Sequence, residues 1–305
     1  MNKVTVFGSF VTDLMMRAER LPVHGETVKG ICFDTGAGGK GSNQGVAASL
    51  SGSEVVMITK IGDDEFGNSA LKSFQSAGID TKYIFRDDSL PTGAALIMVD
   101  DRTSENMIIV TLGACGNIKL AEIDSAIDDI RGSKVFLTQL ETNLDAVYHG
   151  IKLAKSMDIP VILNPAPAER FDEELYKLID YFTPNDTEAA YLSGIEIKSV
   201  CDAERAGKYF IDKGVLNCVF TLGSKGAFLY NKDTAELYEP FKVDVADTTG
   251  AGDAFNGGLA TALAEGKPIG DAIRFAGATA ALCITKTGTA KAMPERAEID
   301  KLLNG

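Results

Sequence analysis

Histidine is almost missing from this chain of 305 residues, which contains only His24 and His149. The two lie far apart in the sequence, so a histidine-based metal site and a Ser-His-Asp triad are nearly excluded as the main chemistry. Cysteine is also scarce, and its five residues form no Cys-x-x-Cys pair (Cys32, Cys115, Cys201, Cys218 and Cys283). We expect buried, reduced thiols in a cytoplasmic protein.

Positive charge is in short supply, because 30 Lys and Arg face 43 Asp and Glu for a net charge of −13. This balance disfavours a nucleic-acid or anionic-membrane surface. An anionic substrate would then be held locally, by backbone N–H groups, a metal or a few cations. Long apolar runs are lacking as well. The N-terminal one is broken by Asp13 and Arg17, so we expect neither a signal peptide nor a membrane span.

What is present is a regular alternation of short β-rich runs and amphipathic helical patterns. The chain is 45% apolar with a mean hydropathy of +0.03, which is typical of one large soluble α/β domain. The predicted strands are Val4–Phe10, Val55–Ile61, Val135–Leu140, Val161–Asn164, Tyr181–Pro184 and Cys218–Leu222. The predicted helices are Ser42–Ser51, Glu65–Ala77, Leu144–Met157, Glu173–Ile179, Asp186–Ser193 and Asp202–Lys213.

This alternation predicts a three-layer α/β sandwich, with a mainly parallel central sheet flanked by helices. Ligands then bind beyond the carboxyl ends of the strands. Two regions break the pattern. Residues 12–35 carry no helical periodicity, and residues 92–111 have the pattern of a hairpin. We interpret them as a small β-sheet lid over the active site, with an outer face that could pair with a second subunit. The alternative is an antiparallel edge of the main sheet.

The stretch DTTGAGDAF, residues 247–255, follows a strand-like alternation over Phe241–Val245 and opens an apolar helical pattern. A helix start with glycines leaves backbone N–H groups accessible to an anion. Asp253 lies in the first turn, where the helix dipole favours a carboxylate. The alternative is a tight turn followed by an ordinary first-turn charge.

A second glycine-rich stretch, TGAGGKGSNQG at residues 35–45, precedes a helix. It fails as a P-loop, because Asp34 stands where the first glycine is needed and Gly41 follows Lys40. Lys40 and Asn43 still meet on one loop that a small polar ligand could approach. A flexible turn before a capped helix is the alternative. No Gly-x-Gly-x-x-Gly follows the first strand, which disfavours an oxidoreductase.

Two further strand ends carry polar residues. Asn185 and Glu188 are three residues apart in TPNDTEAAYL, where they suit either a hydrated Mg²⁺ or a capping box. The stretch TLGSKGAFLY, residues 221–230, predicts a hairpin turn that could also line a nucleotide.

Taken together, these stretches resemble the ribokinase-like (PfkB) family of sugar kinases over nearly the whole chain. The matching strings are GSFVTDL (8–14), GGKGSNQ (38–44), QLE (139–141), NPAPA (164–168), TPNDTE (183–188), TLGSKG (221–226), DTTGAGD (247–253) and RFAGA (274–278). GGKGSNQ with NPAPA is similar to the ribose-phosphorylating branch rather than to phosphofructokinases or adenosine kinases.

The resemblance implies ATP-dependent phosphorylation of the 5-hydroxyl of D-ribose. An anion hole for the moving phosphate is implied at Gly250, Ala251, Gly252 and Asp253, with Asp253 also the catalytic base. The dipole should make that carboxylate a weak base, which a loose transition state tolerates. The implied sugar ligands are Asp13, Gly39, Lys40, Asn43, Glu141 and Asp253.

For ATP and Mg²⁺, the resemblance implies Asn185, Glu188 through metal-bound water, Thr221, Leu222, Gly223, Ser224, Lys225, Gly226, Gly252 and Gly277. For a monovalent cation, expected to be K⁺, it implies Asp247 and the carbonyls of Thr249, Cys283, Lys286 and Gly288. A homodimer through the lid is also expected.

Two positions depart from the family pattern. Val11 replaces a sugar-binding Asn, which leaves ribose and deoxyribose both open, and Ala292 replaces a Ser beside the cation. The remaining alternatives are a related sugar or nucleoside kinase and a non-catalytic sugar-binding regulator. Such a regulator should have lost Asp253 or the nearby glycines, which are present.

Overall fold

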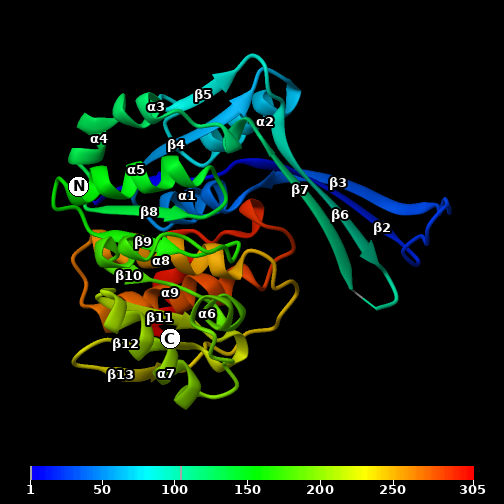
Figure 1. Ribbon diagram of the computed structural model, residues 1–305. Helices are drawn as coiled ribbons and strands as arrows, with labels where there is room; N and C mark the ends of the chain where they lie inside the picture. Colours follow the sequence, from blue (N-terminus) through cyan, green and yellow to red (C-terminus); the bar gives the residue numbers. More distant parts are fainter. Residues whose placement is uncertain (1, 104) are drawn as a thin grey trace.

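The computed structural model describes residues 2–103 and 105–305 and contains a nine-stranded sheet beside a separate four-stranded one (Figure 1). The strand order of the larger sheet is β13-β12-β11-β10-β9-β8-β1-β4-β5. Its strands are β1 (Lys3–Phe7), β4 (Glu54–Gly62), β5 (Ile84–Asp87), β8 (Val135–Gln139), β9 (Val161–Asn164), β10 (Tyr181–Phe182), β11 (Asn217–Thr221), β12 (Ala227–Tyr230) and β13 (Ala235–Tyr238). All neighbours from β5 to β11 pair in parallel, and only β12 and β13 are antiparallel.

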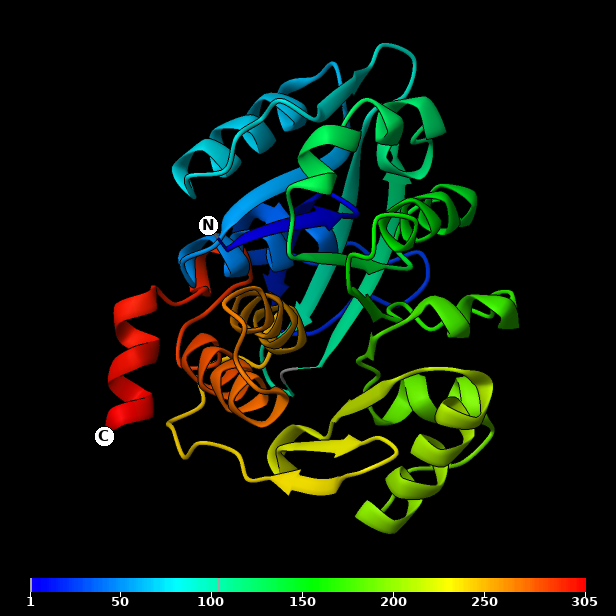
Figure 2. The same cartoon turned by 90° about the vertical axis from the view of Figure 1, so that its left-hand side faces the viewer.

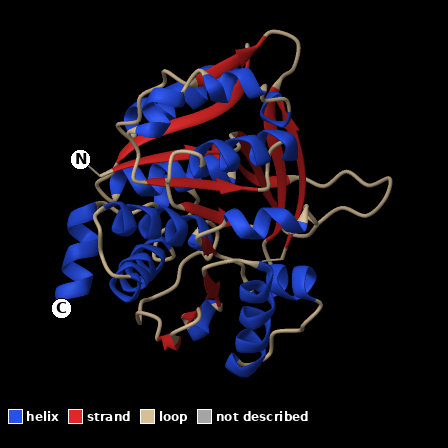
Figure 3. Cartoon of the chain, turned by 60° about the vertical axis from the view of Figure 1, so that its left-hand side comes forward, coloured by secondary structure: helices blue, strands red, loops and turns tan. Residues whose placement is uncertain are grey.

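Helices cover both faces of this sheet, which confirms the three-layer sandwich (Figure 2 and Figure 3). One face carries α1 (Lys40–Leu50), α2 (Glu65–Ser76), α8 (Ala251–Ala264), α9 (Ile269–Cys283) and α10 (Arg296–Asn304). The other carries α3 (Leu120–Asp124), α4 (Ile127–Arg131), α5 (Leu144–Lys155), α6 (Asp186–Ser193) and α7 (Val200–Lys213). Short 3₁₀ turns complete the chain: η1 (Ala114–Gly116), η2 (Glu173–Leu178), η3 (Gly223–Lys225) and η4 (Ala290–Ala292).

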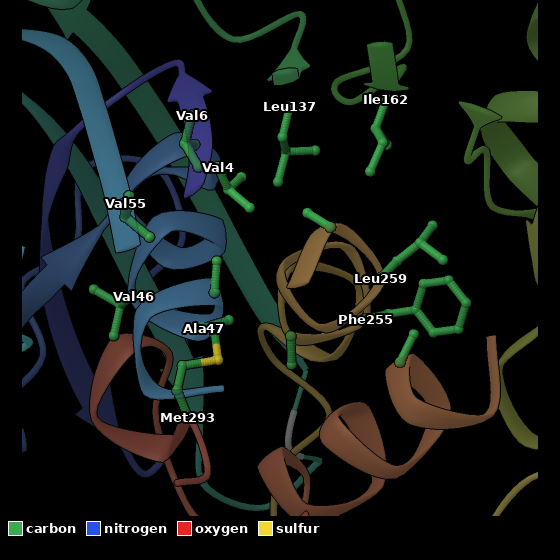
Figure 4. Close-up of a cluster of buried hydrophobic side chains, with 14 of the residues drawn as sticks. Val4, Val6, Val46, Ala47, Val55, Leu137, Ile162, Phe255, Leu259 and Met293 are labelled. Carbon is green, nitrogen blue, oxygen red and sulfur yellow. The ribbon is translucent and has the colours of Figure 1, made fainter. Parts of the chain in front are cut away.

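The central strands alternate their side chains between two buried clusters, as a sheet covered on both faces requires. Leu137 and Ile162 point toward Phe255 and Leu259 of α8 (Figure 4), while Phe136 packs on the opposite face. Each fully buried side chain of this size contributes about 1.5–3 kcal/mol to folding. Most of the surface of α8 is therefore fixed in the core, and its first turn is placed at the strand ends.

The four-stranded sheet, here called the lid sheet, projects from the body (Figure 1). It consists of β2 (Val11–Ala18), β3 (Gly30–Gly38), β6 (Thr92–Asp100) and β7 (Asn106–Gly113) in the order β3-β2-β6-β7. The predicted hairpin over residues 92–111 is confirmed by the pairing of β6 with β7. The alternative, in which these residues form an antiparallel edge of the main sheet, is wrong. The predicted strand Val4–Phe10 ends at Phe7, because the chain then crosses into the lid sheet.

Three other expectations from the sequence are wrong. The Phe241–Val245 segment is not a strand: it runs along α9, where the N–H groups of Ala246 and Asp247 both donate to the Ile284 carbonyl. The predicted helix Glu173–Ile179 is the 3₁₀ turn η2, which ends because Ile179 already adopts an extended conformation. Cys32 and Cys201 are exposed rather than buried: Cys32 lies in the part of β3 whose residues are exposed on both faces, and Cys201 lies in the first turn of α7.

Among residues 2–103 and 105–305, none of the helices combines the length and the apolar character needed to cross a bilayer.

Candidate active site

The first turn of α8 is an open helix start. Gly250 is the N-cap residue with a left-handed φ of 79°, and no side chain of the described residues caps the helix. A Cβ atom on Gly252 would meet nothing within 4 Å, and Gly252 is exposed. The first N–H groups of a helix lack intrahelical acceptors, so this turn presents donors toward open space.

Asp253 lies just behind this opening, with 9% of its surface exposed. The Asn43 Nδ2 amide donates to its Oδ2 at 2.9 Å, and the Gln44 Nε2 amide donates to its Oδ1 at 3.0 Å. Burial raises the pKa of Asp253, while Lys40 and these two amides oppose the rise. Burial therefore outweighs Lys40 and the two amides, a contribution that the sequence expectation, based on the dipole alone, did not include.

Lys40 is a cation that lowers the pKa of Asp253. Burial acts to lower the pKa of Lys40, but the carboxylates of Asp253, Glu141 and Glu188 outweigh it and the pKa is raised. Glu141 follows β8, where its Oε2 accepts hydrogen bonds from the Lys40 backbone N–H at 2.8 Å and from Ser9 Oγ. The α1 N-terminus thus holds a carboxylate beside the Lys40 ammonium.

Asp13 reaches the site from β2 of the lid sheet. Burial raises its pKa to about 6, the Thr289 hydroxyl opposes this, and the Glu141 and Asp253 charges add to it. Thr289 Oγ donates to Asp13 Oδ2 at 3.4 Å. Both residues line a cavity of about 1150 Å³ between the lid sheet and the body, together with Thr249, while Asp253 is not among the lining residues.

Asn185 and Glu188 form the capping box that their spacing allows. The Asn185 side chain accepts from the Glu188 N–H at 2.7 Å, and the Glu188 carboxylate accepts from the Asn185 N–H at 2.9 Å. Burial raises the pKa of Glu188. Asn185 also bridges to Thr221, so the ends of β10 and β11 lie side by side.

The predicted nucleotide-binding turn, Thr221–Gly226, connects β11 and β12 through η3. Its Leu222 N–H donates to the Gly226 carbonyl at 2.8 Å, while the Lys225 ammonium bonds the Lys198 carbonyl instead of facing Asp253. A Cβ on Gly223 would meet nothing within 4 Å, so the turn has an open face. Gly277 lies on α9, where a Cβ would make an ordinary contact with Phe241.

Asp247 joins the two predicted cation-binding segments. Its Oδ1 accepts from the Thr249 N–H at 2.9 Å, and its Oδ2 accepts from the Gly288 N–H at 3.1 Å. Burial acts to raise the Asp247 pKa, but these bonds and Arg17 lower it overall. Cys283 is buried nearby on α9, and Lys286 turns its ammonium to Glu298.

The two positions that depart from the family pattern are both buried. Val11 lies beside Ala95 and Cys115, and Ala292 lies in the core.

Several residues of the site have no role in the analysis of the sequence, although they occur in the matched strings. They are Ser9, Gln44, Gln139 and Asn164. Each lies at a strand end or on the inward face of α1, which is the only signal that could have marked them. Each of them has at least one hydrogen-bond partner about 100 residues or more away along the chain, as with Gln44 and Asn164 at 120.

Comparison with known proteins agrees with this geometry. The PfkB family model, described as "pfkB family carbohydrate kinase", matches residues 1–296. A ribokinase of Haemophilus influenzae is 40% identical, over 97% of this chain and 96% of its own. A deoxyribokinase of Salmonella typhi is 35% identical, over 99% and 98%. The structure of Arabidopsis thaliana ribokinase complexed with ribose and ATP superposes with a TM-score of 0.92 at 30% identity, over 99% and 98%.

The chain belongs to the PfkB family of carbohydrate kinases. It is therefore an ATP-dependent phosphotransferase acting on a sugar, with the ribokinase-like fold.

Proposed function

We propose that this kinase transfers the γ-phosphoryl group of ATP to the 5-hydroxyl of D-ribose, giving D-ribose 5-phosphate. Ribokinases among its relatives support this substrate, with identities up to 40% over the full length. The observation that carries the chemistry is the position of Asp253, whose carboxylate lies in the first turn of α8 directly behind the open helix start at Gly252.

In this reaction the 5-hydroxyl oxygen bonds to the γ-phosphorus, the bond to the ADP oxygen breaks, and the hydroxyl proton passes to Asp253. The N–H groups over residues 250–253 stabilise the negative charge of the phosphoryl group, which is the main requirement of phosphoryl transfer. The raised pKa of Asp253 suits this role, because a more basic carboxylate accepts the proton more readily.

The sugar is held by Asp13, Gly39, Lys40, Asn43 and Glu141 in this proposal. Asn43 donates its amide to Asp253, and its Oδ1 is buried with no hydrogen-bond partner among residues 2–103 and 105–305. A buried acceptor without a donor is unfavourable, so a sugar hydroxyl there would gain a needed partner. The carboxylates of Asp13 and Glu141 can each bridge vicinal hydroxyls.

ATP and Mg²⁺ would lie at the strand ends beside the first turn of α8. The adenine nucleotide would lie along Thr221, Leu222, Gly223, Ser224, Lys225, Gly226 and Gly277, and its phosphates would reach Gly252 and Asn185. The open faces at Gly223 and Gly252 fit such a ligand. Bound Mg²⁺ neutralises phosphate charge, and buried Glu188 would hold its water ligands.

A monovalent cation, expected to be K⁺, would bind Asp247 and the carbonyls of Thr249, Cys283, Lys286 and Gly288. The lowered pKa of Asp247 keeps that carboxylate charged and suited to a cation. Turnover should rise when K⁺ replaces an equal concentration of a bulky organic cation. An unchanged rate would contradict this site. Buried Ala292 has no hydroxyl to act as a further ligand.

Deoxyribose is the second candidate substrate, and Val11 is the observation that favours it. Val11 is 3% exposed in an apolar cluster, so this position offers no hydrogen bond to a sugar hydroxyl. A substrate with one hydroxyl fewer leaves one polar group fewer to satisfy.

A homodimer through the lid sheet is also proposed, with the chain as a single kinase domain. The register sets Phe33 beside Met16 and Ile109 beside Leu96 on one face of that sheet. These four side chains are 38–66% exposed, and an apolar face of this kind typically marks an interface. Asp13 lies on the opposite face, toward the body.

The substrate proposal is tested by measuring ATP consumption with ribose, 2-deoxyribose, hexoses and nucleosides in parallel. We expect the highest kcat/KM for ribose. A substrate other than ribose with a clearly higher value would replace the proposal. Binding of a sugar without turnover of any would identify a non-catalytic regulator.

A further inference from the structure

We propose that Gln44 is a positioning residue that fixes the orientation and charge of the Asp253 carboxylate. This inference rests on the proposed role of Asp253 as the base. It concerns a chain of buried amides behind the site, formed by Gln44, Gln139 and Asn164, which are 0%, 1% and 7% exposed.

The chain starts at a backbone carbonyl, which can only accept. Asn164 Nδ2 donates to the Thr183 carbonyl at 3.0 Å, so Asn164 Oδ1 faces the other way as an acceptor. Gln44 Nε2 donates to that oxygen at 3.0 Å and, with its second hydrogen, to Asp253 Oδ1 at 3.0 Å. The amide of Gln44 therefore presents N–H, rather than its oxygen, to the carboxylate.

Gln139 holds the other end of the Gln44 amide. Its Nε2 donates to Gln44 Oε1 at 2.6 Å, so both groups of the Gln44 amide are engaged. Gly8 makes room for this side chain, because a Cβ there would lie 2.0 Å from Gln139 Oε1. The end of β1 is thus shaped around Gln139, and Gln139 in turn fixes Gln44.

The N–H of Gln44 favours the ionised form of Asp253, as Asn43 and Lys40 on the same helix do. Carboxylates from three other elements oppose it: Glu141 after β8, Glu188 on α6 and Asp13 on the lid sheet. Without Gln44, one of the side chains that stabilise the charge is lost and the carboxylate can rotate. Asp253 would then be less ionised at a given pH, and its carboxylate would be less well oriented toward the sugar hydroxyl.

The test is Gln44→Met, which keeps the side-chain length and removes the amide. We expect kcat to fall by about tenfold to a hundredfold, with the sugar KM within about threefold of wild type. The acid limb of the kcat–pH profile should move to higher pH, because loss of a donor raises the Asp253 pKa. Gln139→Met should change kcat and the acid limb in the same direction as Gln44→Met, but by a smaller amount. The double variant should have a kcat no lower than that of Gln44→Met.

Thr261→Val is the matched control. It also removes buried hydrogen bonds of α8, one that the Thr261 hydroxyl donates to the Ala48 carbonyl of α1 and one that it accepts from Ser53 Oγ, but lies away from Asp253. It should lower thermal stability and leave the acid limb in place. Should Gln44→Met fail to fold, Gln139→Met carries the test alone.

The proposal is overturned if the Gln variants keep the wild-type kcat and acid limb, or if they raise the sugar KM at unchanged kcat. It is also overturned if they lose activity only as the control does. A wild-type enzyme that phosphorylates no sugar would instead overturn the proposed function.

Discussion

The side chain of Asn43 donates a hydrogen bond of 2.9 Å to Oδ2 of Asp253, across 210 residues of sequence. One residue further along α1, Gln44 bonds the other oxygen of the same carboxylate. A single turn of α1 therefore fixes the group that we propose as the base. The part of the site that would hold the sugar and the part that would take its proton are thus joined by direct hydrogen bonds.

Gly252→Ala tests the open helix start separately from stability. A methyl group there meets no atom within 4 Å outside its own helix turn, and alanine is the better helix former, so the free energy of unfolding should stay equal or rise. The methyl group would occupy the space proposed for the phosphate, so kcat should fall by about tenfold or more. Thermal unfolding and steady-state rates, measured on one preparation, check both. Full activity would mean that no phosphate approaches Gly252.

Asp13 should give the enzyme a pH-dependent sugar affinity. Its pKa is raised to about 6, so below that pH it becomes protonated and no longer accepts two hydroxyls. We expect kcat/KM for the sugar to fall as the pH drops through about 6, and Asp13→Asn to be weak at all pH values. An acid limb near 6 that survives in Asp13→Asn would assign it to another group.

The same raised pKa has a consequence for stability. The folded protein binds the Asp13 proton more tightly than the unfolded chain does, so this group lowers stability as the pH rises from about 4 to about 6. Asp13→Asn should therefore raise the free energy of unfolding at pH 8 by about 1 kcal/mol and change it little at pH 4. Equal effects at both values would contradict the shift.

Val11→Asn tests the choice between the two pentoses. Asparagine would place an amide in the apolar cluster of Ala95 and Cys115, where a sugar hydroxyl could satisfy it. The ratio of kcat/KM for ribose to that for deoxyribose should rise by about tenfold or more. Val11→Leu is the control for size, and it should lower both rates without changing the ratio. An unchanged ratio in Val11→Asn would remove this position from the specificity argument.

The lid sheet provides a test of assembly. Leu96→Lys and Ile109→Lys change two neighbouring side chains on its exposed face, and both sites are open enough to keep the fold. Light scattering should show a dimer for the wild type and a monomer for the double variant. A wild type that is monomeric at micromolar concentration would contradict the proposed dimer.

The sequence predicts most of the layered fold, because its strand and helix periods are strong and local. The hairpin over residues 92–111 was also predictable, since apolar strands without a following helix need another sheet. The Phe241–Val245 alternation led to a wrong prediction, because its period suits a strand. The segment instead packs against α9 and forms no strand. Whether a segment of this period pairs with a strand depends on the tertiary structure around it and not on its own sequence.

The site divides in the same way. Asp253 and the glycines before it form a local pattern, so the sequence marks them. The amide chain through Gln44, Gln139 and Asn164 joins three distant segments, and no spacing reveals it. The direction of the Asp253 pKa shift was also out of reach, because it depends on burial, which outweighs Lys40 and the amides.

The most direct test of Asp253 as the base is the turnover of Asp253→Asn. This substitution keeps the shape of the side chain and removes its ability to take a proton. We expect kcat to fall by about a thousandfold or more, with ribose affinity in calorimetry within a few-fold of wild type. A variant that retains most of its turnover would show that the carboxylate behind the α8 helix start is not the base.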